Sequence, residues 1–133
     1  MSNTAFDSYK PTIYSVPINA AVGTSVLVAA KTGVTGGPGT GLSGVPPQAI
    51  APVGWLLTTT GGAATITLTD ATASAPLTGP INISSGGYIF IPINNAADPL
   101  GATSPGDALS AIVTGEAVTG YLQYILLPEN ITP

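Results

Sequence analysis

Apolar residues occur along the chain in short runs that glycine and proline interrupt, which is the pattern of an all-β protein. Two weaker runs, Ser15–Ile18 and Ile50–Val53, are further strand candidates. No stretch shows a sustained helical period with capping residues. Short strands at this spacing predict a single antiparallel β-sandwich of seven to eight strands. The main predicted strands are Thr24–Ala30, Gly54–Thr60, Ala64–Asp70, Leu77–Ile83, Tyr88–Ile93, Ala108–Thr114 and Gly120–Leu127.

The clearest alternation lies in Ala64–Asp70, where Ile66 and Leu68 would face a core and the threonines between them would face outward. A glycine pair, Gly61 and Gly62, precedes this strand. The pattern predicts a hairpin over residues 54–70 with a glycine turn.

A second hairpin is predicted near the end of the chain. The strands Ala108–Thr114 and Gly120–Leu127 flank a short loop at residues 115–119. Short loops of this kind commonly join neighbouring antiparallel strands.

Two predicted strands, Tyr88–Ile93 and Gly120–Leu127, are apolar on both faces. A sheet with one hydrated face would alternate apolar and polar residues, so we expect a neighbouring chain or a loop to cover their outer sides. Proline at position 92 places its strand at a sheet edge or a bulge. The subunit-interface candidates are Tyr88, Phe90, Pro92, Tyr121, Gln123 and Ile125.

The segments between and around the strands predict one domain with extensions. Residues 1–20 carry two prolines and little pattern, and are predicted to form an extended N-terminal arm. Residues 21–133 would form the sandwich domain, with a C-terminal tail at 128–133. Within the domain, Lys31–Gln48 is a Gly/Pro-rich loop longer than compact domains usually carry.

Charge is scarce in this sequence. Charged residues make up 6% of the 133 residues, and the net charge is -4 with two lysines and no arginine, whereas an average domain has about 25%. Binding to nucleic acid or to an anionic membrane needs clustered basic residues, so neither partner is expected. The N-terminus has no basic region followed by an apolar stretch, so we expect a soluble protein without a signal peptide.

Catalytic and metal-binding chemistry finds little support in the residue types. There is no histidine and no cysteine, which removes the commonest general base and the thiolate ligands. The glycines of 39–44 match a dinucleotide-binding pattern, but Pro46 and Pro47 follow, so no helix can begin there. The acids Asp98 and Asp107 lack the ligand spacing of a calcium loop and are interpreted as turn residues. We therefore expect no enzymatic activity, no catalytic or metal site and no cofactor.

Four aromatic residues suggest sugar binding as an alternative to a role in packing alone. Trp55, Tyr88, Tyr121 and Tyr124 are candidates for a platform that stacks on a sugar. Aromatic residues in strands more often belong to a core or an interface, and packing is the interpretation we favour.

Four successive segments carry a resemblance to a known family. The series Leu77–Ile81, Gly86–Phe90, Ser104–Leu109 and Val118–Tyr124 resembles small auxiliary virion proteins of tailed bacteriophages, over about residues 54–127. The resemblance implies a capsid decoration (cement) protein, a jelly roll that sits on the shell as a homotrimer. It brings no catalytic residue with it.

The expected function is therefore structural. The chain would bind the outer surface of a phage head and stabilise it by bridging capsid subunits, with the major capsid protein and copies of itself as partners. It would be made in the host cytoplasm and reside on the virion. The alternative is a phage tail, fibre or surface module that binds carbohydrate or receptor through exposed aromatic residues. The capsid-contact candidates lie in the arm and the long loop: Phe6, Tyr9, Tyr14, Lys31, Pro38 and Leu42.

Overall fold

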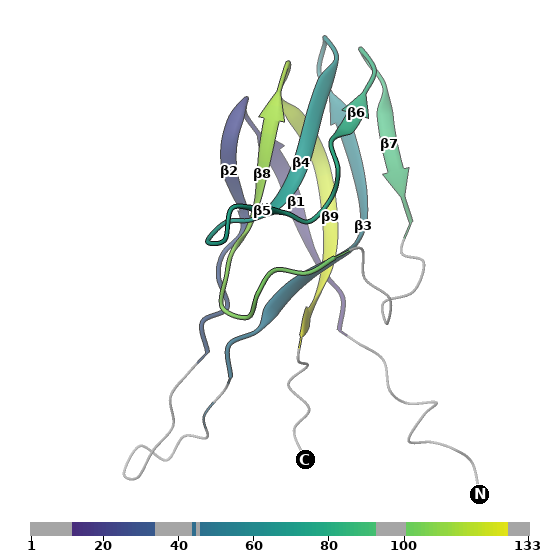
Figure 1. The fold of residues 1–133 in the computed structure, drawn as a ribbon. Coiled ribbons are helices and arrows are strands. Elements are labelled where there is room, and N and C mark those ends of the chain that lie inside the picture. The colour runs from purple at the N-terminus through teal and green to yellow at the C-terminus, as the bar shows by residue number, and fades with distance from the viewer. Residues whose placement is uncertain (1–11, 34–43, 45, 93–100, 128–133) are drawn as a thin grey trace, which may run out of the picture.

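The computed structural model describes residues 12–33, 44, 46–92 and 101–127, and this part of the chain contains strands and no helix (Figure 1). Every strand pairs with its neighbours in antiparallel orientation. The strands are β1 (Tyr14–Ala20), β2 (Gly23–Val28), β3 (Ala49–Thr59), β4 (Ala64–Asp70), β5 (Ala75–Pro76), β6 (Ile81–Ile83), β7 (Tyr88–Ile91), β8 (Leu109–Thr114) and β9 (Val118–Leu127).

The strands form two sheets that pack face to face. The four-stranded sheet has the order β1-β9-β3-β7, and the five-stranded sheet has the order β2-β8-β4-β5 with β6 also paired to β4. The predicted all-β sandwich is thus confirmed, whereas a jelly-roll connectivity stays a prediction.

Both predicted hairpins are wrong. β3 and β4 follow one another in the chain but lie in different sheets, and the same holds for β8 and β9. Each short connection carries the chain across the sandwich, from one sheet to the strand that faces it. The alternation of a strand shows which side faces the core, but two strands that face one another across that core alternate in the same way as two that pair.

The predicted N-terminal arm is wrong from Tyr14 onward. Residues 14–20 form β1, which pairs with β9 along its whole length, and Ile18 and Ala20 are buried in the core. The weaker strand candidate Ser15–Ile18 lies inside β1 and is confirmed. Residues 1–11 lie outside the described part of the chain.

The strand β3 joins two runs that the sequence presents as separate. Its register with β9 shifts between Pro52 and Gly54, which leaves Val53 as an extra residue in a β-bulge. The bulge reverses which positions face inward: Ile50 lies in the core before it, and Trp55 and Leu57 lie in the core after it. The sequence of this one strand of eleven residues therefore contains two patterns of alternation, with opposite positions facing the core.

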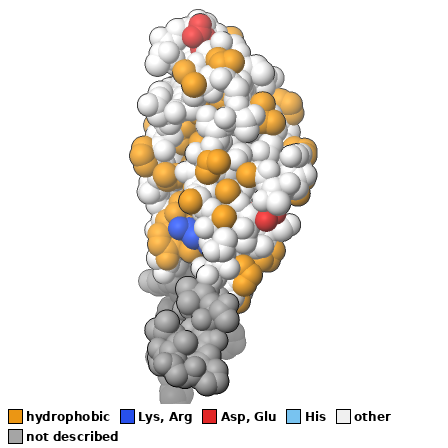
Figure 2. Space-filling model, turned by 90° about the vertical axis from the view of Figure 1, so that its left-hand side faces the viewer, with side chains coloured by type: hydrophobic (Ala, Val, Ile, Leu, Met, Phe, Trp, Pro, Cys, Tyr) orange, Lys and Arg blue, Asp and Glu red, His pale blue; other side chains and the backbone are white. Residues whose placement is uncertain are grey.

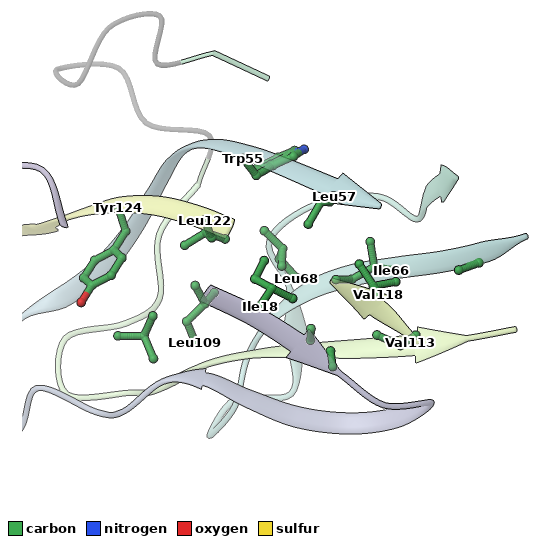
Figure 3. Close-up of a cluster of buried hydrophobic side chains, with 14 of the residues drawn as sticks. Ile18, Trp55, Leu57, Ile66, Leu68, Leu109, Val113, Val118, Leu122 and Tyr124 are labelled. Atoms are coloured by element: carbon green, nitrogen blue, oxygen red, sulfur yellow. The ribbon is translucent and has the colours of Figure 1, made fainter. Parts of the chain in front are cut away.

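The core fills the space between the two sheets, as Figure 3 shows. Leu57 and Leu122 from the four-stranded sheet meet Ile66, Leu68 and Leu109 from the five-stranded sheet, and all five are fully buried. Burying one such side chain contributes about 1.5–3 kcal/mol. The sandwich is thus held together by aliphatic packing.

Candidate functional surface

The outer face of the four-stranded sheet is the side of its strands that points away from the core. Leu56 lies between the core residues Trp55 and Leu57, so its side chain points outward. The strand pairing sets Leu56 between Tyr121 of β9 and Phe90 of β7, and sets Tyr121 beside Pro17 of β1. One row of apolar side chains, here named the apolar row, thus crosses all four strands: Pro17, Tyr121, Leu56 and Phe90.

The apolar row is open to solvent at both ends. Phe90 is 51% exposed, and its neighbour on β7, Tyr88, is 69% exposed. Pro17 is exposed as well, while Leu56 and Tyr121 are half-buried between them. Contiguous exposed apolar side chains, in contrast to single ones, mark surfaces where other molecules dock.

Uncharged polar side chains flank the apolar row on both sides. On one side the hydroxyl oxygens of Thr58 and Thr119 lie 2.9 Å apart in a hydrogen bond. The row that holds these two threonines also contains Asn19, and the row on the other side contains Ser15 and Gln123. None of these flanking positions carries a charge.

The predicted interface residues gather on this one face. Tyr88, Phe90, Tyr121 and Gln123 all point to the outer side of the four-stranded sheet. Pro92 is exposed and directly follows β7, which confirms the prediction that its strand lies at a sheet edge.

Ile125 differs from the other interface candidates. It faces the same side, but it is 2% exposed and packs with Ala51, Val53 and Leu127 in a second apolar cluster. Its side chain is already covered within the single chain, so it does not offer a contact surface.

Two of the six capsid-contact candidates, Tyr14 and Lys31, lie in the described part of the chain. Tyr14 begins β1, and its ring stacks on that of Tyr124 with the centroids 5.4 Å apart. Lys31 is half-buried where its carbonyl accepts a hydrogen bond from the amide of Gln48, 2.9 Å away. The other four candidates, Phe6, Tyr9, Pro38 and Leu42, lie outside the described residues.

The aromatic platform proposed from the sequence does not form as one surface. Trp55 and Tyr124 belong to the core cluster (Figure 3). Tyr88 and Tyr121 lie on the outer side of their strands. Burial raises the pKa of the Tyr124 hydroxyl above its usual value. The packing interpretation therefore holds for Trp55 and Tyr124, and the outward aromatic group consists of Tyr88, Phe90 and Tyr121.

Sequence reasoning missed an acid pair at one end of the sandwich. The Asp70 carboxylate accepts hydrogen bonds from the backbone amides of Thr72 at 3.0 Å, Ala73 at 3.1 Å and Ser104 at 2.8 Å. Asp107 makes a side-chain hydrogen bond to the same carboxylate. These bonds tie the turn after β4 to the loop that precedes β8.

The two carboxyl groups have opposite pKa shifts. Burial acts to raise the pKa of Asp70, but the hydrogen bonds from Ser104, Ala73, Asp107 and Thr72 outweigh it and hold that pKa below its usual value. The hydrogen bond to Asp70 and partial burial raise the pKa of Asp107. The opposite shifts are those expected where a protonated Asp107 carboxyl donates a hydrogen bond to an ionised Asp70 in mildly acidic solution.

The geometry gives the acid pair a structural role. Three backbone amides occupy the Asp70 carboxylate, which is 3% exposed. Within the described ranges, no three acidic, histidine or cysteine side chains cluster as metal ligands would. The amide of Asp107 also closes a turn onto the Ser104 carbonyl at 3.0 Å, which confirms the turn interpretation of Asp107; Asp98 lies outside the described residues.

The chain was compared with family models, characterised proteins and solved structures, and no match was found. In the part of the chain that is described, no helix is long and apolar enough to cross a membrane. The outer face of the four-stranded sheet is therefore the feature from which a function must be argued.

Proposed function

We propose that this protein is a non-enzymatic structural subunit that works by packing its sheet faces against other protein chains. The observation that carries the proposal is the uncharged outer face of the four-stranded sheet, where the apolar row runs between two neutral polar rows. Free soluble domains normally carry charged residues of both signs across such faces. A face of this kind suits contact with protein instead of contact with water.

The position of the charges supports the same conclusion. Among the described residues, the charged side chains are Lys31, Asp70, Asp107 and Glu116, and they lie in loops or at the end of a strand. On the face that Figure 2 shows, the acidic and basic side chains form small isolated spots among hydrophobic side chains and the white of uncharged polar side chains and backbone. Contacts made through the sheet faces would therefore bury almost no charge, which avoids its desolvation cost.

The specific assembly that we propose is the outer surface of a tailed-phage head, with the chain as a decoration protein. This step rests on the resemblance of the segments between residues 54 and 127 to auxiliary virion proteins. A subunit that bridges neighbouring capsid proteins binds the intact lattice and not its separated parts, so its binding free energy stabilises the shell. Many weak contacts at fixed geometry then act together.

Binding to purified empty shells of the phage that carries this gene tests the proposal. We expect the full chain to cover the shells at many copies each and to raise the temperature at which they open. A variant that lacks residues 1–13 keeps β1 and the whole sandwich, so its thermal unfolding should be unchanged. That variant should lose shell binding if the N-terminal residues make the capsid contact.

Two results would contradict this proposal in different ways. If the full chain does not bind shells, the decoration role is wrong. If the truncated chain decorates them as fully as the full chain does, the assignment of shell contact to the N-terminal residues is wrong. A low copy number in purified particles would instead indicate a tail or head-completion component.

A second candidate function is recognition of carbohydrate or receptor by a tail or fibre module. The observation that favours it is the outward aromatic group Tyr88, Phe90 and Tyr121, because exposed aromatic rings stack on sugars. A glycan array tests this function with Tyr88→Ala as the matched variant. Oligosaccharide binding that this substitution removes would favour recognition over decoration.

A further inference from the structure

We infer that the outer face of the four-stranded sheet docks like-on-like against a second copy of this chain, with the two apolar rows in contact. This inference names a partner for the proposed structural role and rests on it.

The geometry of the apolar row suits packing between two sheets. Neighbouring strands lie about 4.8 Å apart, so a row across four strands extends roughly 14 Å. Two sheets that pack face to face interdigitate their side chains across a layer about 10 Å thick. Phe90 and Pro17, exposed at the two ends of the row, would enter the corresponding face of the second copy.

The borders of the row favour an identical partner. The hydroxyls of Thr58 and Thr119 are already hydrogen-bonded to each other. The side-chain amides of Asn19 and Gln123 each contain both a donor and an acceptor. Such groups can pair with copies of themselves, whereas carboxylates or ammonium groups would repel their copies. A partner of opposite charge would call for charged residues here, and these rows contain none.

The distribution of acidic residues keeps like charges out of this contact. Asp70, Asp107 and Glu116, the acids of the described residues, lie outside the outer face of the four-stranded sheet. Two chains of the same negative charge can therefore approach one another face to face. An apolar centre inside a neutral polar border is also the usual composition of a protein–protein interface.

The edge strand β7 is the least protected strand beside this face. Natural sheets guard their edges with proline, charge or a bulge. The edge strand β1 contains Pro17, β5 contains Pro76, and β2 has a register shift between Val26 and Val28. β7 has no such feature between Tyr88 and Ile91, and it carries the most exposed aromatic side chains of the sheet.

The size and symmetry of the contact determine the oligomeric state that we expect. A like-on-like contact has two-fold symmetry, so the first associated species should be a dimer. A face of four strands buries less than about 1,200 Å² in total, which is typical of weak association. The trimer that the family resemblance implies would need a further contact.

Sedimentation equilibrium of the full chain over a wide concentration range tests the inference. Phe90→Lys places a charge in the apolar row, where it would oppose its copy. Val26→Lys is the matched control, because Val26 is 62% exposed on an edge strand of the other sheet and the change in net charge is the same. We expect wild type and Val26→Lys to dimerise alike, and Phe90→Lys to dimerise at least tenfold more weakly with an unchanged melting curve.

The inference is overturned if wild type remains a monomer throughout the range, or if the two lysine variants weaken dimerisation equally. It is also overturned if an oligosaccharide binds the monomer and contacts Phe90, because the face then has another occupant. Shell binding of wild type, measured separately from its dimerisation, distinguishes the two proposals. A chain that dimerises through this face but binds no shell would refute the decoration role and leave the dimer standing.

Discussion

At the scale of single residues, Gly120 shows how backbone geometry builds the outer face. It has a φ of +137°, which L side chains rarely adopt, and an added Cβ would overlap the carbonyl oxygen of Leu56 on the paired strand. The close approach of β9 to β3 at this point sets Tyr121 beside Leu56. A glycine is therefore needed next to the centre of the apolar row.

Gly120→Ala should destabilise the fold by about 2–4 kcal/mol, since it combines backbone strain with a steric overlap inside the sheet. Urea unfolding measures this loss. Gly61→Ala is the matched control, because no atom lies within 4 Å of the Cβ it would add. Equal, small effects of the two substitutions would show that the close approach at Gly120 is not needed.

Asp70 and Asp107 make opposite contributions to the pH dependence of stability. Asp70 has a folded-state pKa below the ordinary value of 3.8, so its contribution is present above that value and is lost as the pH falls. Asp107 has a raised pKa, so its contribution is complete below 3.8 and is lost as the pH rises through its folded-state pKa. Stability should therefore be greatest in mildly acidic solution and decline toward neutral pH.

Asp107→Asn should remove the decline in folding stability between mildly acidic and neutral pH. The asparagine amide can donate to Asp70 as the protonated acid does, but it does not ionise. Urea unfolding at several pH values should show that the free energy of unfolding of the variant rises relative to that of wild type from acidic to neutral pH. A difference between the two proteins that does not change with pH would contradict the proton-sharing arrangement.

At the scale of elements, the loop before β8 is fastened to the start of β3 by Thr103. This side chain is buried, and its hydroxyl oxygen accepts a hydrogen bond from the amide of Ile50 at 2.9 Å. The amide of Thr103 donates in turn to the Ile50 carbonyl at 3.0 Å. The loop thus extends the hydrogen bonding of β3 at a position where no other strand of the described residues pairs with it on that side.

Thr103→Val keeps the shape of the side chain but leaves the buried amide of Ile50 without its acceptor. The free energy of unfolding should fall by about 1–3 kcal/mol, which is the cost of an unsatisfied buried donor. Thr103→Ser keeps the hydroxyl and should fall nearer to wild type in urea unfolding. If the serine variant is as unstable as the valine variant, packing of the methyl group and not the hydrogen bond fastens this loop.

Elements also show what the sequence can predict. The alternation of Ala64–Asp70 predicts β4 with its observed bounds, because both of its faces keep one phase throughout. In β3 the inward-facing positions change from even to odd numbers at Val53. The sequence therefore shows its two halves as separate runs and does not show that they form one strand. Sheet membership depends on contacts between strands that are distant in the chain, so local pattern could not show that residues 60–63 and 115–117 connect the two sheets and do not close hairpins.

At the scale of the whole molecule, the outward side chains of β7 and β9 were predictable from period-two alternation, and Tyr88, Phe90, Tyr121 and Gln123 follow it. Their alignment with Pro17 and Leu56 into one row was not predictable, because it depends on the registers of three strand pairs. The acid pair Asp70–Asp107 was not predicted for the same reason, because one member ends β4 and the other lies in a loop distant in the chain.

The central claim is that other protein covers the outer face of the four-stranded sheet when the chain does its work. Hydroxyl-radical footprinting measures this cover directly, by comparing the dilute free chain with the chain in intact particles. Oxidation of Tyr88, Phe90 and Tyr121 should fall strongly in the particle. Unchanged oxidation of all three residues in a particle that demonstrably contains the protein would contradict this claim.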